Sequence, residues 1–82
     1  MQVQIKNKCG LHARPAGQLV KVAQEYDSEL KIRYQEKEAN AKSILDVLML
    51  AAESGCDLEI SARGRDASKA LSSIWDFFQK EM

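Results

Sequence analysis

Histidine and proline each occur only once in this sequence of 82 residues, as His12 and Pro15, and cysteine occurs twice, as Cys9 and Cys56. One histidine and two separated cysteines are too few ligands for a zinc site, and a secreted disulfide-rich domain would contain more cysteines. The sequence offers no Ser-His-Asp arrangement to assign. We therefore expect no bound metal or cofactor, and two free thiols of the kind found in a reducing compartment.

The sequence also lacks a charge imbalance and long apolar runs. Its 12 basic and 12 acidic side chains give a formal net charge of zero, whereas a protein that binds nucleic acid needs a basic excess for the phosphates. No apolar run approaches the roughly 20 residues of a membrane-spanning helix. Residues 1–6 do not show the charged-then-apolar order of a signal peptide. We expect a cytoplasmic protein without membrane insertion and without a nucleic-acid partner.

Hydrophobic periodicity predicts seven elements in one domain, residues 1–82. Alternating patterns predict short strands near 2–6, 29–35, 37–41 and 58–63. Helical spacing predicts helices from 13 to about 25, from 43 towards 55, and from 67 to 78, with Asp66 as the cap of the last one and with Trp75 and Phe77 flanking its apolar stripe. The order β-α-β-β-α-β-α predicts an α/β two-layer sandwich (α+β), in which the helices cover one face of an antiparallel sheet.

The first predicted helix places a histidine at its beginning. Pro15 fits only the first turn, so His12 lies at or near the N-cap. Unpaired first-turn amides and the helix dipole favour an anion there. A phosphoryl group on the His12 imidazole could be held by the amides of Ala13 and Arg14 and by the Arg14 guanidinium. By spacing alone, however, a lone histidine at a helix start is more often a cap or a surface residue.

The second predicted helix is more apolar than a helix on a sheet requires. Ser43 and Asp46 have the spacing of a capping box, and Gly55 is the expected C-terminal stop. Such a helix buries only one stripe, so some of its apolar side chains must stay near the surface and predict a docking patch. The apolar residues are Ile44, Leu45, Val47, Leu48, Met49, Leu50 and Ala51.

Two motifs in this sequence are similar to those of one protein family. The segment Gly10-Leu11-His12-Ala13-Arg14-Pro15-Ala16 closely resembles the active-site motif of the HPr family, the histidine-containing phosphocarriers of the bacterial phosphoenolpyruvate:sugar phosphotransferase system. The segment Ala41-Lys42-Ser43-Ile44 resembles the family's second signature, around a regulatory serine. The resemblance extends over the whole chain and implies a sheet of strand order 1-4-2-3 with three helices on one face.

The resemblance also implies a function and its partners. His12 would accept a phosphoryl group on Nδ1 from phospho-enzyme I, which obtains it from phosphoenolpyruvate, and pass it to IIA domains of sugar permeases. Arg14 would be the active-site arginine, and the protein would be a carrier rather than an enzyme. The alternatives are a carrier in a nitrogen-related or regulatory phosphotransfer branch, and a regulatory binding module without transfer. The presence of His12 counts against the last of these.

The resemblance further assigns a docking surface and a regulatory residue. Ile44, Leu45 and Leu48 would dock onto donor and acceptors, together with Ala13 and Gly17 of the first helix. The alternative for the three apolar residues is simple core packing, which we expect for Val47 and Leu50. A monomer suits a carrier that shows one patch to several partners. Ser43 would be the target of HPr kinase/phosphorylase, unless it is only an N-cap.

Overall fold

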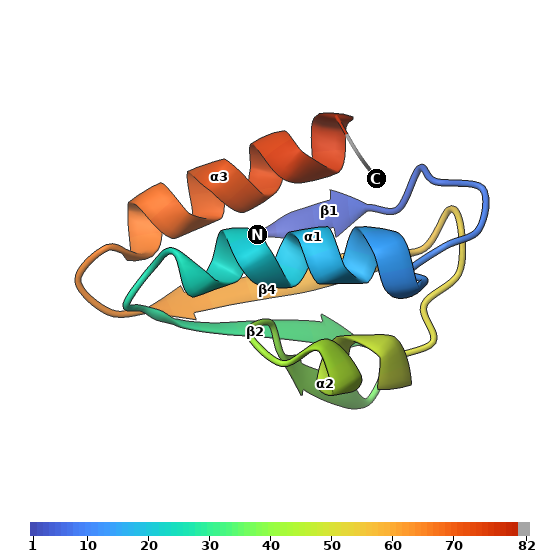
Figure 1. The fold of residues 1–82 in the computed structure, drawn as a ribbon, viewed down its shortest axis with the longest axis horizontal. Helices are drawn as coiled ribbons and strands as arrows, with labels where there is room; N and C mark the ends of the chain where they lie inside the picture. Colours follow the sequence, from blue (N-terminus) through green and yellow to red (C-terminus); the bar gives the residue numbers. More distant parts are fainter. Residues whose placement is uncertain (81–82) are drawn as a thin grey trace.

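The computed structural model describes residues 1–80, and its seven elements follow the predicted order (Figure 1). The strands are β1 (Gln2–Gln4), β2 (Glu29–Tyr34), β3 (Lys37–Asn40) and β4 (Asp57–Arg63). The helices are α1 (Ala13–Gln24), α2 (Ile44–Met49) and α3 (Ala67–Lys80). The predicted end of the domain at residue 82 lies outside the described residues. No helix within residues 1–80 is long and apolar enough to cross a membrane.

The four strands form one antiparallel sheet in the order β1-β4-β2-β3, as predicted. Its register places apolar side chains opposite one another, with Val3 beside Leu58, and Ile32 between Ile60 and Ala39. All five side chains are buried. The three helices cover this face of the sheet (Figure 1), which confirms the two-layer architecture.

Each long helix turns one apolar stripe towards the sheet. In α1 the buried residues are Pro15, Ala16, Leu19, Val20 and Ala23. In α3 they are Ala70, Ile74, Phe77 and Phe78. Trp75 remains exposed, whereas Phe77 turns inward and packs edge-to-face on Phe78, with ring centroids 5.8 Å apart. The buried stripe of α3 therefore includes Phe77, which was predicted to flank it.

The end of α2 differs from the prediction. The helix ends at Met49, well before Gly55, and Ala51 has the positive φ (51°) that was expected of a glycine stop. Ala52 then leaves the helix direction, and its carbonyl oxygen accepts a hydrogen bond from the Leu11 amide at 3.0 Å. Gly55 also has a positive φ (85°), but it serves the later turn into β4.

Of the two predicted caps, Ser43 caps α2 as expected, whereas the carboxylates of Asp46 and Asp66 bond elsewhere. Ser43 is the N-cap of α2, and its Oγ accepts a hydrogen bond from the Asp46 amide at 3.4 Å. The reciprocal bond of a capping box is replaced, because the Asp46 carboxylate accepts from the Asn40 amide at 3.2 Å instead. Asp66 precedes α3, but its carboxylate accepts hydrogen bonds from the amides of Asp27 and Ser28, each at 2.9 Å. This carboxylate thus fastens the loop between α1 and β2.

Candidate functional site

His12 lies where the sequence places it, at the N-cap of α1. Its backbone is extended (φ −103°, ψ −177°), and its side chain makes no capping hydrogen bond. The helical bonds begin with the Ala16 amide, which donates to the His12 carbonyl at 2.9 Å. The amides of Ala13 and Arg14 precede that bond and therefore have no partner within the helix. The exposed imidazole of His12 accordingly stands beside the positive end of the α1 dipole.

The backbone on the N-terminal side of His12 is fixed by the loop that follows α2. Leu11 is 5% exposed, and its amide donates to the Ala52 carbonyl at 3.0 Å. Gly10 has a φ of 71°, and a Cβ atom there would lie only 2.6 Å from the Ala52 oxygen. The His12 amide donates to the Gly10 carbonyl at 3.1 Å. An exposed ring is thus mounted on a tightly held backbone.

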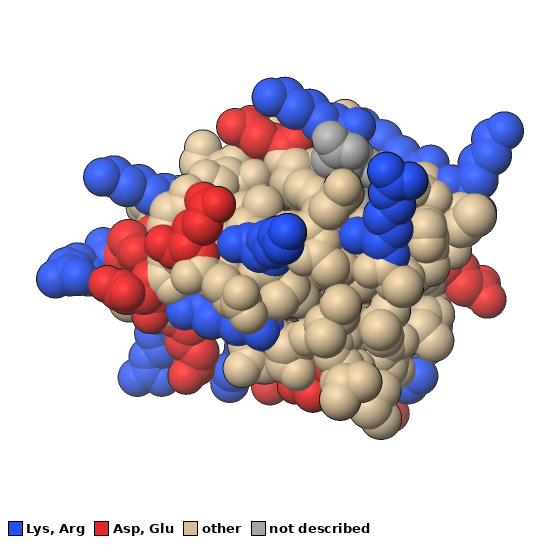
Figure 2. Space-filling view, viewed as in Figure 1, with Lys and Arg blue, Asp and Glu red and all other residues tan. Residues whose placement is uncertain are grey.

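The other predicted phosphate-binding residues lie in the same first turn. Ala13 and Arg14 are both exposed, while the neighbouring Pro15 is buried against the core. No ion pair found among residues 1–80 involves Arg14, so its guanidinium is available for an anion. In Figure 2 basic side chains stand over the middle and N-terminal part of α1, whereas acidic and basic ones are mixed towards its C-terminal end. The electrostatics of this end suit a phosphoryl group.

Helix α2 presents an apolar surface beside α1. Ile44, Leu45 and Met49 are 42%, 69% and 75% exposed, and we call these three residues the α2 surface. Figure 2 shows largely uncharged atoms over this helix. Leu48, which we predicted for docking, is half-buried and packs against the core. Met49 was not among the predicted docking residues, although its place in the apolar segment could have indicated it.

Gly17 of α1 lies beside Ile44 of the α2 surface. It is half-buried, and a Cβ atom on it would lie 3.5 Å from Cδ1 of Ile44. Val47 and Leu50 point the other way and are buried, at 0% and 2% exposure, which confirms their expected place in the core. The structure therefore brings the first two turns of α1 against the beginning of α2.

The backbone around Ser43 is tied to the other end of α1. Ser43 is half-buried. The Gln24 side-chain amide donates to the Lys42 carbonyl at 3.1 Å, and the Lys42 ammonium donates to the Tyr26 carbonyl. Ser43 consequently does not share the His12 loop, and α1 and α2 both run between the two regions.

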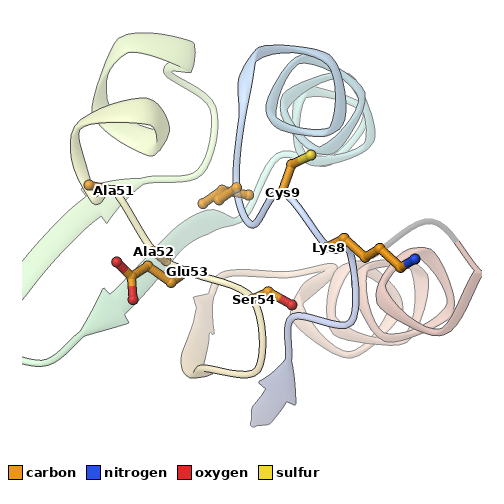
Figure 3. Close-up of a pocket in the computed structure, with 7 residues that line it drawn as sticks. Lys8, Cys9, Ala51, Ala52, Glu53 and Ser54 are labelled. Carbon is orange, nitrogen blue, oxygen red and sulfur yellow. The ribbon is translucent and has the colours of Figure 1, made fainter.

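The two cysteines are free, and one lies beside the histidine loop. Cys9 is exposed, and Cys56 is half-buried with its sulfur 3.3 Å from the Tyr34 hydroxyl. Cys9 borders an open hollow of about 490 Å³ between the loop before α1 and the loop after α2 (Figure 3). Within residues 1–80 no group of three or more His, Cys, Asp or Glu residues could hold a metal ion.

Known proteins are similar to this chain in both sequence and fold. A family model described as "PTS HPr component phosphorylation site" matches residues 1–80. The phosphocarrier protein HPr of Mycoplasma capricolum is 43% identical over 70 residues, which are 85% of this chain and 79% of that protein.

Two solved structures of similar proteins superimpose closely on this chain. One is HPr-C-His from Thermoanaerobacter tengcongensis, with a TM-score of 0.93 and 35% identity over 96% of this chain and 89% of that one. The other is the histidine-containing phosphocarrier protein of a Mycoplasma, with a TM-score of 0.91 and 39% identity over 94% and 88%. The family match, the identity and the shared fold together show that this chain belongs to the HPr family of the phosphotransferase system.

Proposed function

We propose that this protein carries phosphoryl groups on Nδ1 of His12, which it receives from phospho-enzyme I and passes to IIA domains of sugar permeases. The observation that carries the proposal is the placement of His12 in a chain of the HPr family. Its ring is exposed at the N-cap of α1 and makes no capping hydrogen bond. The phosphoryl group itself originates from phosphoenolpyruvate.

The transfer needs little from the protein besides position and charge. In the neutral ring protonated at Nε2, the Nδ1 lone pair attacks phosphorus, and the bond from phosphorus to the donor atom of enzyme I breaks with its electron pair. The amides of Ala13 and Arg14 and the Arg14 guanidinium then face the phosphoryl oxygens. Delivery to a IIA domain is the same exchange with the acceptor's nucleophile. Within residues 1–80 we assign His12 neither a base nor an enclosing pocket, so the partners would complete the site.

The α2 surface, with Leu48, Ala13 and Gly17, is the proposed docking face for donor and acceptors. Its exposed apolar side chains stand beside the basic side of α1, and such a face suits a partner with an apolar, acidic surface. The protein acts in the cytoplasm. It acts as a monomer, because one docking face must serve several partners in turn. A solved relative, HPr of Thermoanaerobacter tengcongensis, forms a dimer, so light scattering at working concentration tests this part.

We also propose that Ser43 is phosphorylated by HPr kinase/phosphorylase to regulate the carrier. Ser43 begins the helix that bears the α2 surface, and a phosphate adds close to two negative charges there. An acid-stable label that requires ATP and the kinase, and that is lost in Ser43→Ala, supports this regulation. A serine that the kinase leaves unlabelled is an N-cap only.

The carrier function is tested with enzyme I and radiolabelled phosphoenolpyruvate. The expected product is an acid-labile, base-stable phosphoprotein, absent in His12→Ala. A label that persists in His12→Ala contradicts the proposal, as does the absence of label with a competent enzyme I. Offering the phosphoprotein to a sugar IIA domain and to a nitrogen-type IIA domain then distinguishes the two branches.

A further inference from the structure

We propose that Ala51 is a positioning residue for phosphoryl transfer at His12, because its left-handed backbone turn aims the carbonyl group that holds the histidine loop. The proposal rests on the proposed function and extends it to a residue outside both recognised motifs. Ala51 follows the end of α2 and faces the loop before α1 across the hollow in Figure 3.

The backbone of Ala51 is in an unusual conformation. Its φ is 51°, a left-handed value that a residue with a Cβ atom rarely adopts. Within residues 1–80 only one other residue besides glycine has a positive φ, namely Gln35 at 56°, in the two-residue turn between β2 and β3. Gln35 serves a hairpin, whose turn favours such an angle. The angle at Ala51 serves no hairpin, and its effect is on the residue that follows.

The turn at Ala51 determines where the Ala52 carbonyl group lies relative to the end of α2. Val47 and Leu50 anchor the end of α2 in the core, at 0% and 2% exposure. The Ala51 amide still donates to the Leu48 carbonyl at 3.1 Å. The left-handed φ then reverses the chain, so that the next residue, Ala52, is buried and presents its carbonyl to the Leu11 amide. A helical φ at Ala51 would continue α2 and carry that carbonyl elsewhere.

The held loop includes the residue next to His12. The Leu11 amide donates to the Ala52 carbonyl in the loop after α2, and Gly10 lies so close to the Ala52 oxygen that only a glycine fits. The loop after α2 is also bonded to the residue that follows β1, since the Gly55 amide donates to the Ile5 carbonyl at 2.7 Å. His12 therefore keeps a fixed place relative to α2.

A fixed place relative to α2 matters because α2 carries the proposed docking surface. A partner seated on that surface meets the His12 nitrogen at a distance set by the Ala51 turn. In-line transfer is sensitive to such placement, and an error of about 1 Å costs on the order of 100-fold in rate. Ala51 should accordingly govern kcat for phosphorylation and not the affinity for enzyme I.

The experiment compares Ala51→Val with a matched variant, Gln35→Val. Both place a β-branched residue at a similar positive φ, which such residues avoid, but only one lies beside the histidine loop. With enzyme I and phosphoenolpyruvate we expect Ala51→Val to lower kcat about 10- to 100-fold, with KM within about twofold, whereas Gln35→Val keeps both values. Ala51→Gly should keep most of the kcat of the unmodified protein, because glycine accepts the angle. Hydrogen exchange of the Leu11 amide should accelerate in Ala51→Val alone.

The outcomes separate this proposal from the carrier function. If Ala51→Val and Gln35→Val are phosphorylated equally fast, or if the Leu11 amide stays as protected as in the unmodified protein, Ala51 has no positioning role while the carrier function stands. If the unmodified protein accepts no phosphoryl group, the carrier function fails and this proposal falls with it. Should Ala51→Val not fold, Ala51→Leu, without branching at Cβ, replaces it under the same criteria.

Discussion

Cδ1 of Ile44 lies 3.5 Å from the point that a Cβ atom on Gly17 would occupy. This proximity places α1 against α2 and sets two of the predicted docking residues side by side. A separation of 3.5 Å is ordinary van der Waals contact, so the gap admits one methyl group without displacing Ile44.

Gly17→Ala should therefore stabilise the protein. Glycine within a helix costs roughly 0.5–1 kcal/mol relative to alanine, and Gly17 lies inside α1. We expect the free energy of unfolding, measured by urea denaturation, to rise by about that amount. A lower free energy in Gly17→Ala would mean that the two helices pack more closely than this contact indicates.

Leu45→Ala should weaken docking without weakening the fold. Leu45 is 69% exposed, and truncating an exposed residue changes stability by about 0.5 kcal/mol or less. As a central contact of a docking face it should raise KM for enzyme I about 5- to 30-fold, the equivalent of roughly 1–2 kcal/mol. Trp75→Ala is the matched control, because Trp75 is also exposed, at 45%, but lies on α3. Equal KM values for the two variants would exclude the α2 surface as the docking face.

Gly10→Ala should destabilise the protein far more than Gly55→Ala. Both glycines have a positive φ, which costs an alanine on the order of 1 kcal/mol. A Cβ atom on Gly10 would also lie 2.6 Å from the Ala52 oxygen, whereas one on Gly55 meets nothing within 4 Å. Urea denaturation should show losses of about 3 kcal/mol or more and about 1 kcal/mol, respectively. Similar losses for the two variants would show that the backbone around Gly10 shifts at little cost to accommodate a Cβ atom.

The stability of the protein should fall between pH 4 and pH 2 through Asp66. Hydrogen bonds from the Ser28 hydroxyl and from the Asp27 amide lower the pKa of Asp66 to about 2, from 3.8. Since the unfolded chain takes up this proton at the higher pH, its contribution to stability is full above about pH 4 and is lost as the pH falls towards 2. The difference in unfolding free energy between the protein and Asp66→Asn should shrink over this range. A difference that stays constant down to pH 2 would contradict the low pKa.

The elements that follow hydrophobic periodicity were predictable from the sequence, and so was the position of His12. Alternation in 29–34 and helical spacing in 13–24 determine which face each element buries, and Pro15 has only one acceptable place in α1. Exposure of Leu45 and burial of Val47 likewise follow from the width of one helical stripe. These features are local, so spacing alone was enough to predict them.

The features that depend on contacts between distant segments could not be predicted. The Asp66 carboxylate bonds to residues 27 and 28 rather than to its own helix, and the Asp46 carboxylate bonds to Asn40. Ala51 takes a left-handed φ that its residue type disfavours. The sequence therefore pointed to Gly55, rather than Ala51, as the end of the second helix. The pairing of Ala52 with Leu11, which joins segments far apart in the sequence, accounts for that difference.

Phosphorus–nitrogen coupling in the phosphorylated protein tests the central claim most directly. The protein is labelled with ¹⁵N in the His12 imidazole, phosphorylated with enzyme I and phosphoenolpyruvate, and examined by ³¹P and ¹⁵N NMR. The account predicts one coupled pair, between phosphorus and Nδ1 of His12. Coupling to Nε2, or a phosphoprotein without any phosphorus–nitrogen coupling at His12, would contradict it.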